Sequence, residues 1–126
     1  MHEMGIVQNI MEILEEQARM HNVSKIVRVG LEFGALTAVM PDAVRFAFEL
    51  LSKDGPAEGA SLDITIIPLK VRCLECGAEH VMDEYQPMCP SCDSASLTFI
   101  EGRDEMRIAF MEVEDRGGEE NRGDPS

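Results

Sequence analysis

The sequence predicts an α+β protein with a small three-stranded sheet, two helices on one face of that sheet, and an inserted four-cysteine module. Amphipathic helical patterns alternate with strands of period two, and this order suits helices packed on one side of a sheet. All four cysteines lie in one stretch between the second and third predicted strands. With 126 residues, 44% of them apolar, the chain is long enough for one domain and a small insertion.

Two helices are expected, over residues 3–20 and roughly 41–52. In the first, apolar residues recur at helical spacing opposite a charged face. These apolar positions are Val7, Ile10, Met11, Leu14 and Ala18. In the second, Pro41 suits the first helical position, and Val44, Phe48 and Leu51 form one stripe.

Three strands are expected from alternating apolar residues in "SKIVRVGLEFG", "LDITII" and "DEMRIAFMEVED". The apolar face of the first is predicted to carry Val27, Val29, Leu31 and Phe33. In the third stretch the alternation changes parity between Phe110 and Met111, which predicts a β-bulge there.

The predicted strands and the change of composition divide the chain into three parts. Residues 1–69 and 101–115 are expected to form the α+β domain, and residues 70–100 the cysteine module. Residues 116–126 are polar and Gly-rich, so we expect a disordered tail.

The charge balance limits the classes of partner. The chain has 11 basic and 24 acidic residues, for a net charge of −13. Phosphate backbones require a basic surface, so nucleic acid is excluded as a partner. The first 20 residues lack the features of a signal peptide, and no apolar run is long enough for a membrane helix. We therefore expect a cytoplasmic protein without membrane insertion, for which a homo-oligomer is compatible with the sequence.

The cysteines form two C-x-x-C pairs, Cys73/Cys76 and Cys89/Cys92, and the residues 77–88 separate them. In a reducing compartment such pairs are typical metal ligands, and a tetrahedral set of four thiolates favours zinc. A zinc ion held by all four would have no open position, so its role would be to fold a segment with almost no core of its own. Two redox dithiols, or iron in the same site, are the alternatives.

The three histidines are His2, His21 and His80. His21 follows the first helix and is expected to be solvated, whereas His80 lies in the cysteine module, as an exposed residue or an extra metal ligand. His2 follows the chain's first residue, where the α-amine, the imidazole and backbone amides could chelate one Ni(II) or Cu(II) ion. A frayed terminus is the alternative interpretation.

Three separated motifs in one order resemble the HypA/HybF family of hydrogenase-maturation nickel metallochaperones, over residues 1 to about 114. They are "MHEM", "GLEFGALTAVMPDAVRFAFELL" and the pair "CLECG" and "CPSC". The resemblance implies a nickel site that uses the Met1 amine, the His2 imidazole and backbone nitrogens near Glu3. It also implies structural zinc at Cys73, Cys76, Cys89 and Cys92.

The same resemblance implies that the protein delivers nickel to the large subunit of a [NiFe] hydrogenase, together with a HypB-type GTPase. In some organisms members of the family also supply nickel to urease. Asp42 or His80 could complete the nickel ligands. We find no catalytic constellation and no phosphate loop in the sequence, so a carrier is expected, and not an enzyme. The alternatives are a zinc-ribbon adaptor that docks on a protein without cargo metal, and an iron electron carrier.

Overall fold

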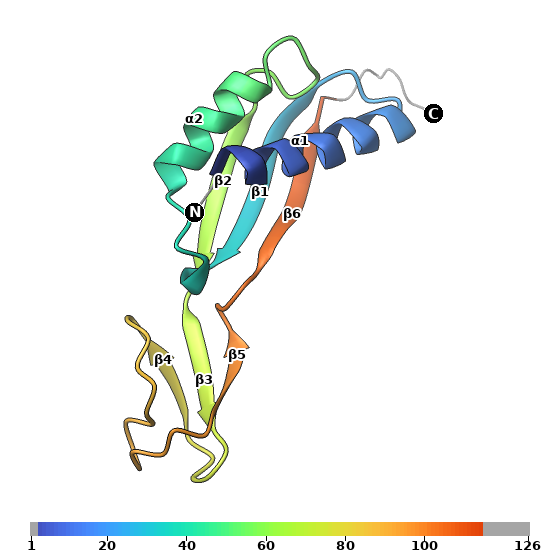
Figure 1. Ribbon diagram of the computed structural model, residues 1–126. Coiled ribbons are helices and arrows are strands. Elements are labelled where there is room, and N and C mark those ends of the chain that lie inside the picture. The colour runs from blue at the N-terminus through green and yellow to red at the C-terminus, as the bar shows by residue number, and fades with distance from the viewer. Residues whose placement is uncertain (1–2, 115–126) are drawn as a thin grey trace.

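Two helices cover one face of the larger sheet in the computed structural model, which describes residues 3–114 (Figure 1). Helix α1 spans Glu3–Met20 and helix α2 spans Pro41–Leu51, so both predicted helices are confirmed within one residue. A short 3₁₀ turn, η1 (Ala35–Thr37), precedes α2. Pro41 occupies the start of α2, where its missing N–H costs no intrahelical hydrogen bond.

The larger sheet has the strand order β2-β1-β6. Its strands are β1 (Ile26–Gly34), β2 (Ser61–Ile67) and β6 (Met106–Val113). Strand β1 pairs in parallel with β2 and antiparallel with β6. The parallel pair requires a crossover connection, and α2 supplies it. The prediction of three strands with two helices on one face is therefore confirmed, and the structure adds the strand order.

The main core lies between the two helices and the inner face of this sheet. Val7 and Leu14 of α1, Phe33 of β1 and Val44 of α2 are all at most 1% exposed. Each such side chain contributes roughly 1.5–3 kcal/mol through its removal from water. The helical stripe read from the sequence is therefore the buried one, because every predicted apolar position of α1 is buried.

The prediction for the strand faces is wrong at two positions. Ile26 is buried and Val27 only partly so, because the pairing of β1 with β6 shifts register between Ile26 and Arg28. The second shift leaves Ala109 without a partner, so the bulge in β6 precedes Phe110 and does not follow it. Phe110 consequently lies on the outer face of the sheet, with its ring directly over Gly30.

The cysteine stretch contains a second three-stranded sheet with the order β4-β3-β5, which the sequence pattern did not predict. Its strands are β3 (Leu69–Cys73), β4 (Glu79–Met82) and β5 (Leu97–Glu101), all antiparallel. Leu69, Val71 and Met82 are buried together, against the partly buried Leu97 and Phe99. The expectation of almost no core is therefore wrong: the alternation in β3 and β4 builds a small one. From here on the cysteine module means residues 69–101, from the start of β3 to the end of β5, one residue longer at each end than the predicted 70–100.

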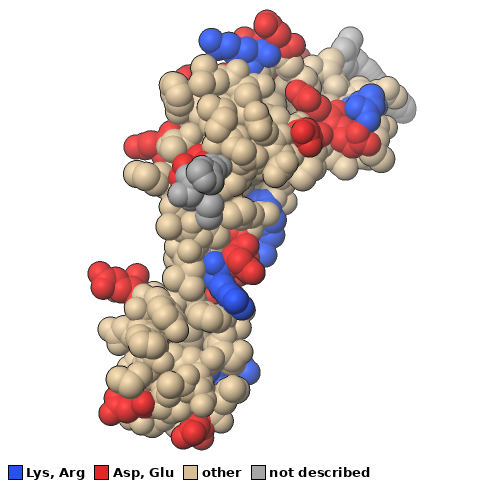
Figure 2. Space-filling model, in the orientation of Figure 1, with Lys and Arg blue, Asp and Glu red and all other residues tan. Residues whose placement is uncertain are grey.

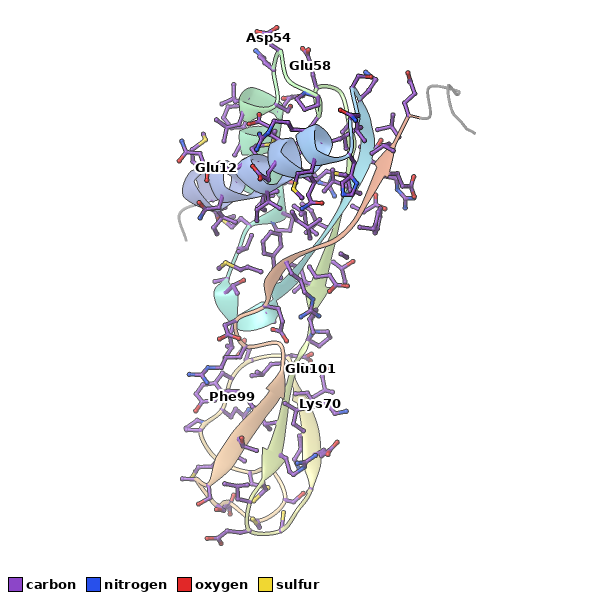
Figure 3. All side chains as sticks on the ribbon, turned by 90° about the vertical axis from the view of Figure 1, so that its right-hand side faces the viewer. Glu12, Asp54, Glu58, Lys70, Phe99 and Glu101 are labelled. Atoms are coloured by element: carbon purple, nitrogen blue, oxygen red, sulfur yellow. The ribbon has the colours of Figure 1, made fainter. Side chains whose placement is uncertain are left out.

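A narrow neck joins the larger sheet to the cysteine module (Figures 1 and 3). Gly102 has a φ of +87°, and an added Cβ would lie 2.2 Å from the carbonyl oxygen of Pro68. The N–H of Leu36 donates to the carbonyl of Gly102 at 2.9 Å, and the N–H of Gly34 donates to the carbonyl of Glu105 at 2.9 Å. Backbone contacts too close for a side chain therefore fix this crossing.

Acidic side chains lie on both parts of the surface, and basic ones stand beside them without forming a patch on the visible face (Figure 2). Most of the ion pairs join side chains of neighbouring strands, such as Arg28 with Asp63 and Arg72 with Glu79. Neither helix of the described chain combines the length and the apolar character that a membrane crossing needs. The predicted tail of residues 116–126 lies outside the described residues.

Candidate metal centre

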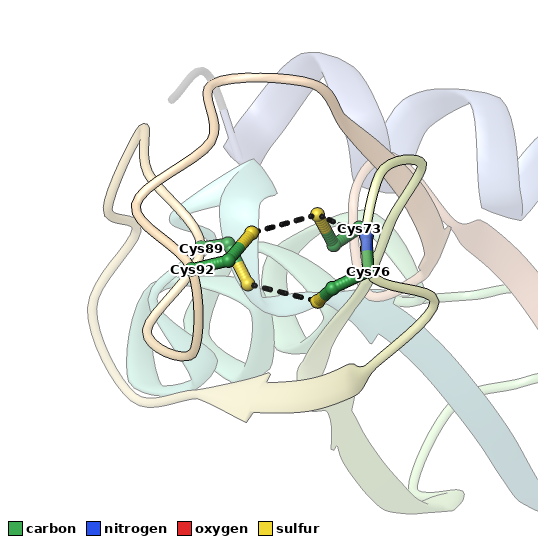
Figure 4. A group of neighbouring side chains, drawn as sticks. All are labelled: Cys73, Cys76, Cys89 and Cys92. Carbon is green, nitrogen blue, oxygen red and sulfur yellow. Dashed lines mark hydrogen bonds between the residues drawn. The ribbon is translucent and has the colours of Figure 1, made fainter.

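The fold brings the four cysteines together, beginning where β3 ends at Cys73 (Figure 4). Their sulfur atoms all lie within 4.8 Å of one another, and all four are free thiols. The shortest distances join the two pairs: 3.6 Å from Cys73 to Cys92 and 3.7 Å from Cys76 to Cys89. Four sulfurs placed tetrahedrally at about 2.3 Å from a zinc ion would be about 3.8 Å apart. The donor set and its spacing therefore fit one tetrahedral ion.

The first pair lies on a tight turn, the first knuckle, where β3 ends. The sulfur of Cys73 accepts hydrogen bonds from the N–H groups of Glu75 and Cys76, both at 3.4 Å. The N–H of Gly77 returns to the carbonyl of Cys73 at 3.0 Å, and the N–H of Cys73 donates to Ala78 at 2.9 Å. Gly77 has a φ of +78°, which a glycine adopts without strain.

The second pair repeats this arrangement and forms the second knuckle. The N–H of Ser91 donates to the sulfur of Cys89 at 3.3 Å, and the N–H of Asp93 returns to the carbonyl of Cys89 at 2.9 Å. Cys89 itself donates to the carbonyl of Ser94 at 2.7 Å. Asp93 has a φ of +62° and occupies the position that Gly77 has in the first knuckle. The sequence analysis missed this role, although Asp tolerates the left-handed region better than most residues.

The thiols ionise unequally when only the protein's own groups act on them. The N–H of Cys76, with help from that of Glu75, lowers the pKa of Cys73 to about 6. A hydrogen bond from the backbone of Ser94 lowers the pKa of Cys92, but the neighbouring Cys73 sulfur and burial outweigh it and raise that pKa to about 12. One sulfur thus releases its proton easily while its neighbour keeps one. Four thiolates at this spacing need a cation among them.

His80 is neither a loop residue nor remote from this centre. It lies on β4, partly buried, with Nε2 3.1 Å from the hydroxyl oxygen of Ser91 and 4.0 Å from the sulfur of Cys89. The four sulfurs already supply a tetrahedral set, so His80 contacts the ligand shell from outside it. His21, by contrast, is exposed in the turn after α1.

The other predicted site begins at the chain terminus, and the structure describes part of its neighbourhood. Met1 and His2 lie outside the described residues, and Glu3 is the first residue of α1. The Glu3 carboxylate accepts a hydrogen bond of 3.1 Å from the N–H of Met40, the residue just before α2. Asp42 lies exposed in the first turn of α2. The start of α1 therefore lies against the start of α2, whereas His80 belongs to the cysteine module on the other side of the neck.

These features define a small two-part protein with a group of four cysteines that could hold one metal ion. A sequence profile described as hydrogenase/urease nickel incorporation, metallochaperone, hypA matches residues 1–113. A protein named hydrogenase maturation factor HypA from Moorella thermoacetica is 43% identical over 115 residues, which cover 90% of this chain and 100% of that protein. Its namesake from Acidithiobacillus ferrooxidans is 41% identical over 114 residues, with the same coverage. The chain therefore belongs to the HypA family.

Solved structures agree with this assignment. The solution structure of the Ni metallochaperone HypA from Helicobacter pylori matches with a TM-score of 0.64 and 25% identity, over 90% of this chain and 97% of that one. A second solution structure, described as that of HypA protein, matches with a TM-score of 0.67 and 26% identity, over 90% and 96%. As a member of this family, the protein is a maturation factor for hydrogenase nickel incorporation and not a catalyst.

Proposed function

We propose that this protein binds Ni(II) at its N-terminus and delivers it for the maturation of a [NiFe] hydrogenase. The observation that carries this proposal is the hydrogen bond between Glu3 and Met40. It holds the start of α1 beside the start of α2, where Asp42 adds a carboxylate to the same region. Glu3 and Asp42 thus place two carboxylates where the described chain begins, and this negative charge supports the binding of a divalent cation nearby.

The proposed nickel ligands are the Met1 amine, the His2 imidazole and backbone nitrogens near Glu3. Fused chelate rings from an amine, an imidazole and amide nitrogens suit square-planar Ni(II). A site at the end of the chain uses few protein ligands and is open to a recipient, which suits a carrier that must release its cargo. Asp42 lies on the α2 side of the same region, whereas His80 contacts the second knuckle, so Asp42 is the better candidate for a further ligand.

Zinc is the proposed occupant of Cys73, Cys76, Cys89 and Cys92. Bound there, it would supply charge neutralisation and a cross-link between the two knuckles. Each knuckle already aims backbone N–H groups at its first sulfur, which supports the thiolate form that zinc requires. Elemental analysis distinguishes zinc from iron in the same four-sulfur set, and an iron-loaded protein would be coloured whereas a zinc-loaded one would not.

The proposed partners are the large subunit of a [NiFe] hydrogenase and a GTPase of the HypB type, in the cytoplasm. The protein's acidic surface supports protein partners and a metal ion over nucleic acid. We assign nickel binding to residues 1–69 and 101–115, and the structural ion to residues 70–100.

The decisive experiment compares nickel binding by the native chain with binding by His2→Ala and by a chain extended by two residues at the N-terminus. The extension keeps every side chain but moves the amine away from His2. Both variants are expected to keep zinc and to lose high-affinity nickel binding in calorimetric titration. His21→Ala is the matched control, because it removes an exposed histidine remote from the terminus, and it should bind nickel like the native chain.

Unchanged nickel binding in both terminal variants would refute the terminal site. Failure of the native chain itself to bind nickel would favour the alternative, a zinc-ribbon adaptor without cargo metal. Loss of nickel with loss of zinc would instead indicate that the variants had unfolded, and circular dichroism of the helices separates that result.

A further inference from the structure

The side chain of His80 lies on the inner face of the cysteine module. His80 pairs with Val71 in the register of β4 and β3, and Val71 is fully buried. Met82, two residues further along β4, shares its side of the strand and is buried in the module's small core. The partly buried imidazole therefore lies between this core and the second knuckle, where it meets the exposed Ser91.

At the second knuckle the imidazole meets two groups. Its Nε2 lies 3.1 Å from the hydroxyl oxygen of Ser91 and 4.0 Å from the sulfur of Cys89. Either neutral tautomer can bond to Ser91, because a hydroxyl both donates and accepts. Ser91 in turn donates its backbone N–H to the sulfur of Cys89 at 3.3 Å. The histidine thus contacts a metal-ligand sulfur and the residue that supports that sulfur.

This contact joins the second knuckle to another element of the module. Its backbone hydrogen bonds, between Cys89 and Ser94 and between Asp93 and Cys89, stay within the knuckle. Within residues 3–114, the sulfur–sulfur contacts that reach it from other elements come from Cys73 and Cys76. From β4, His80 adds contacts to the sulfur of Cys89 and the hydroxyl of Ser91. One further bond reaches the residues just after the knuckle, where the N–H of Leu74 donates to the carbonyl of Ser96 at 2.8 Å.

We propose that His80 and Ser91 are positioning residues that hold the second knuckle against the first around the bound metal. The inference rests on the metal centre proposed above. Bound there, an ion would be held by sulfurs of both knuckles, and the His80–Ser91 bond would keep the two sulfurs of the second knuckle in place whenever one metal–sulfur bond opened. Groups just outside a ligand shell commonly act in this way on metal affinity.

The test uses the full chain loaded with zinc and measures the rate of zinc transfer to a chromogenic chelator. His80→Ala is expected to release zinc roughly tenfold faster than the native chain, and Ser91→Ala by a similar factor. His80→Gln is expected to restore near-native release, because its amide nitrogen can occupy the place of Nε2. His21→Ala, which removes an exposed histidine outside the module, is the matched control and should release zinc at the native rate.

Cobalt substitution supplies a readout that a loss of packing alone would not move. The sulfur-to-cobalt charge-transfer bands of the native chain are expected to shift in His80→Ala and to return in His80→Gln. Native release rates in both alanine variants would overturn the inference, and so would a glutamine variant that behaves like alanine. A native chain that binds no zinc or cobalt would refute the metal centre itself, which is a different outcome.

Discussion

The carboxylate of Glu3 accepts a hydrogen bond from the backbone N–H of Met40, with the two atoms 3.1 Å apart. Glu3 is the first residue of α1, and Met40 is the N-cap of α2. A contact across 37 positions of sequence thus joins the starts of both helices. It fixes the position of Glu3, the residue next to the proposed terminal ligands, against the start of α2.

Removal of this contact should loosen the terminus without unfolding the core. Glu3→Ala is expected to lower the free energy of unfolding by about 1 kcal/mol, the usual range for an exposed hydrogen bond. Nickel affinity should fall with it, because the terminal ligands lose their anchor. Glu3→Gln keeps an acceptor oxygen and the backbone nitrogens, so it should bind nickel nearly as the native chain does. Titration calorimetry of the two variants checks this, and equal affinity in both would exclude a role for the anchor.

Nickel binding should weaken on acidification, because both proposed terminal donors must lose a proton to bind. The reference pKa values are roughly 7.7–8.0 for an α-amine and about 6.5 for an imidazole. Protons therefore compete with nickel increasingly as the pH falls from about 8 to about 6. Titrations at about pH 5.5 and about pH 7.5, on either side of the imidazole value, measure the effect, with the zinc content determined in parallel. Equal nickel affinity at both pH values would contradict an amine–imidazole site.

Periodicity predicted the two helices well because each has a single buried face, which packs into the one core shared by both helices and the larger sheet. Every apolar position proposed for α1 is buried, and Pro41 begins α2 as expected. Periodicity failed in β1 and β6, where local pairing overrides alternation. The unpaired Ala109 turns Phe110 outward onto Gly30, a position open to the ring only because Gly30 has no side chain.

The spacing of the cysteines predicted the metal centre, but not the scaffold that holds it. The C-x-x-C pairs identify ligands because each local turn contains both of its own sulfurs. The sheet of β3, β4 and β5 depends on pairing between segments distant in sequence, such as Val71 with Phe99. The role of Asp93 depends on a backbone dihedral, and that of His80 on which face of β4 it occupies. Neither is visible as a motif.

The neck should tolerate no side chain at Gly102. An added Cβ would lie 2.2 Å from the carbonyl oxygen of Pro68 and 2.5 Å from the Cα of Leu69, and the backbone has a φ of +87°. Backbone atoms cannot move aside as a side chain can. Gly102→Ala is therefore expected to cost about 3 kcal/mol or more of unfolding free energy, from crowding added to left-handed strain.

Gly59→Ala is the matched control for crowding at the neck. Gly59 has a similar φ of +79°, but nothing lies within 4 Å of the position that an added Cβ would take. It should cost only the strain of the left-handed backbone, about 1–2 kcal/mol. Urea unfolding of both variants measures the difference. Equal losses would show that the contact with Pro68 does not contribute.

The carboxylate of Glu105 should contribute stability only above the acidic range. Both its oxygens accept the N–H of Gly102, at 3.1 and 2.9 Å, and this bond lowers the pKa of Glu105. A lowered pKa in the folded state means that the stabilisation is full above the unfolded-state pKa of about 4.3 and disappears as the pH falls through the folded value. The native chain should therefore exceed Glu105→Gln in stability at about pH 7. The difference should shrink as the pH falls below the unfolded-state pKa and vanish once the pH is below the lowered folded-state pKa.

Urea unfolding of the native chain and Glu105→Gln at several pH values measures this difference. Metal loss in acid affects both chains and cancels in the comparison. Glu101→Gln is the control, because Glu101 is an exposed carboxylate that ends β5 just before Gly102, whereas the N–H of Gly102 donates to Glu105. A difference between the native chain and Glu105→Gln that persists unchanged into acid would contradict the proposed carboxylate bond.

Removal of the metal should unfold the cysteine module while the larger sheet stays folded. Among the described residues, the apolar core of the module consists of the buried Leu69, Val71 and Met82 with two partly buried neighbours, and each buried side chain contributes roughly 1.5–3 kcal/mol. A structural zinc ion supplies about 10–16 kcal/mol at neutral pH. The core between α1, α2 and the larger sheet does not depend on the ion. Hydrogen exchange after chelation should therefore show lost protection in β4 and both knuckles and retained protection in α1 and β1. Simultaneous loss in both parts would mean that the neck couples them into a single folding unit, and retained protection in β4 would mean that the module's small core suffices without a metal.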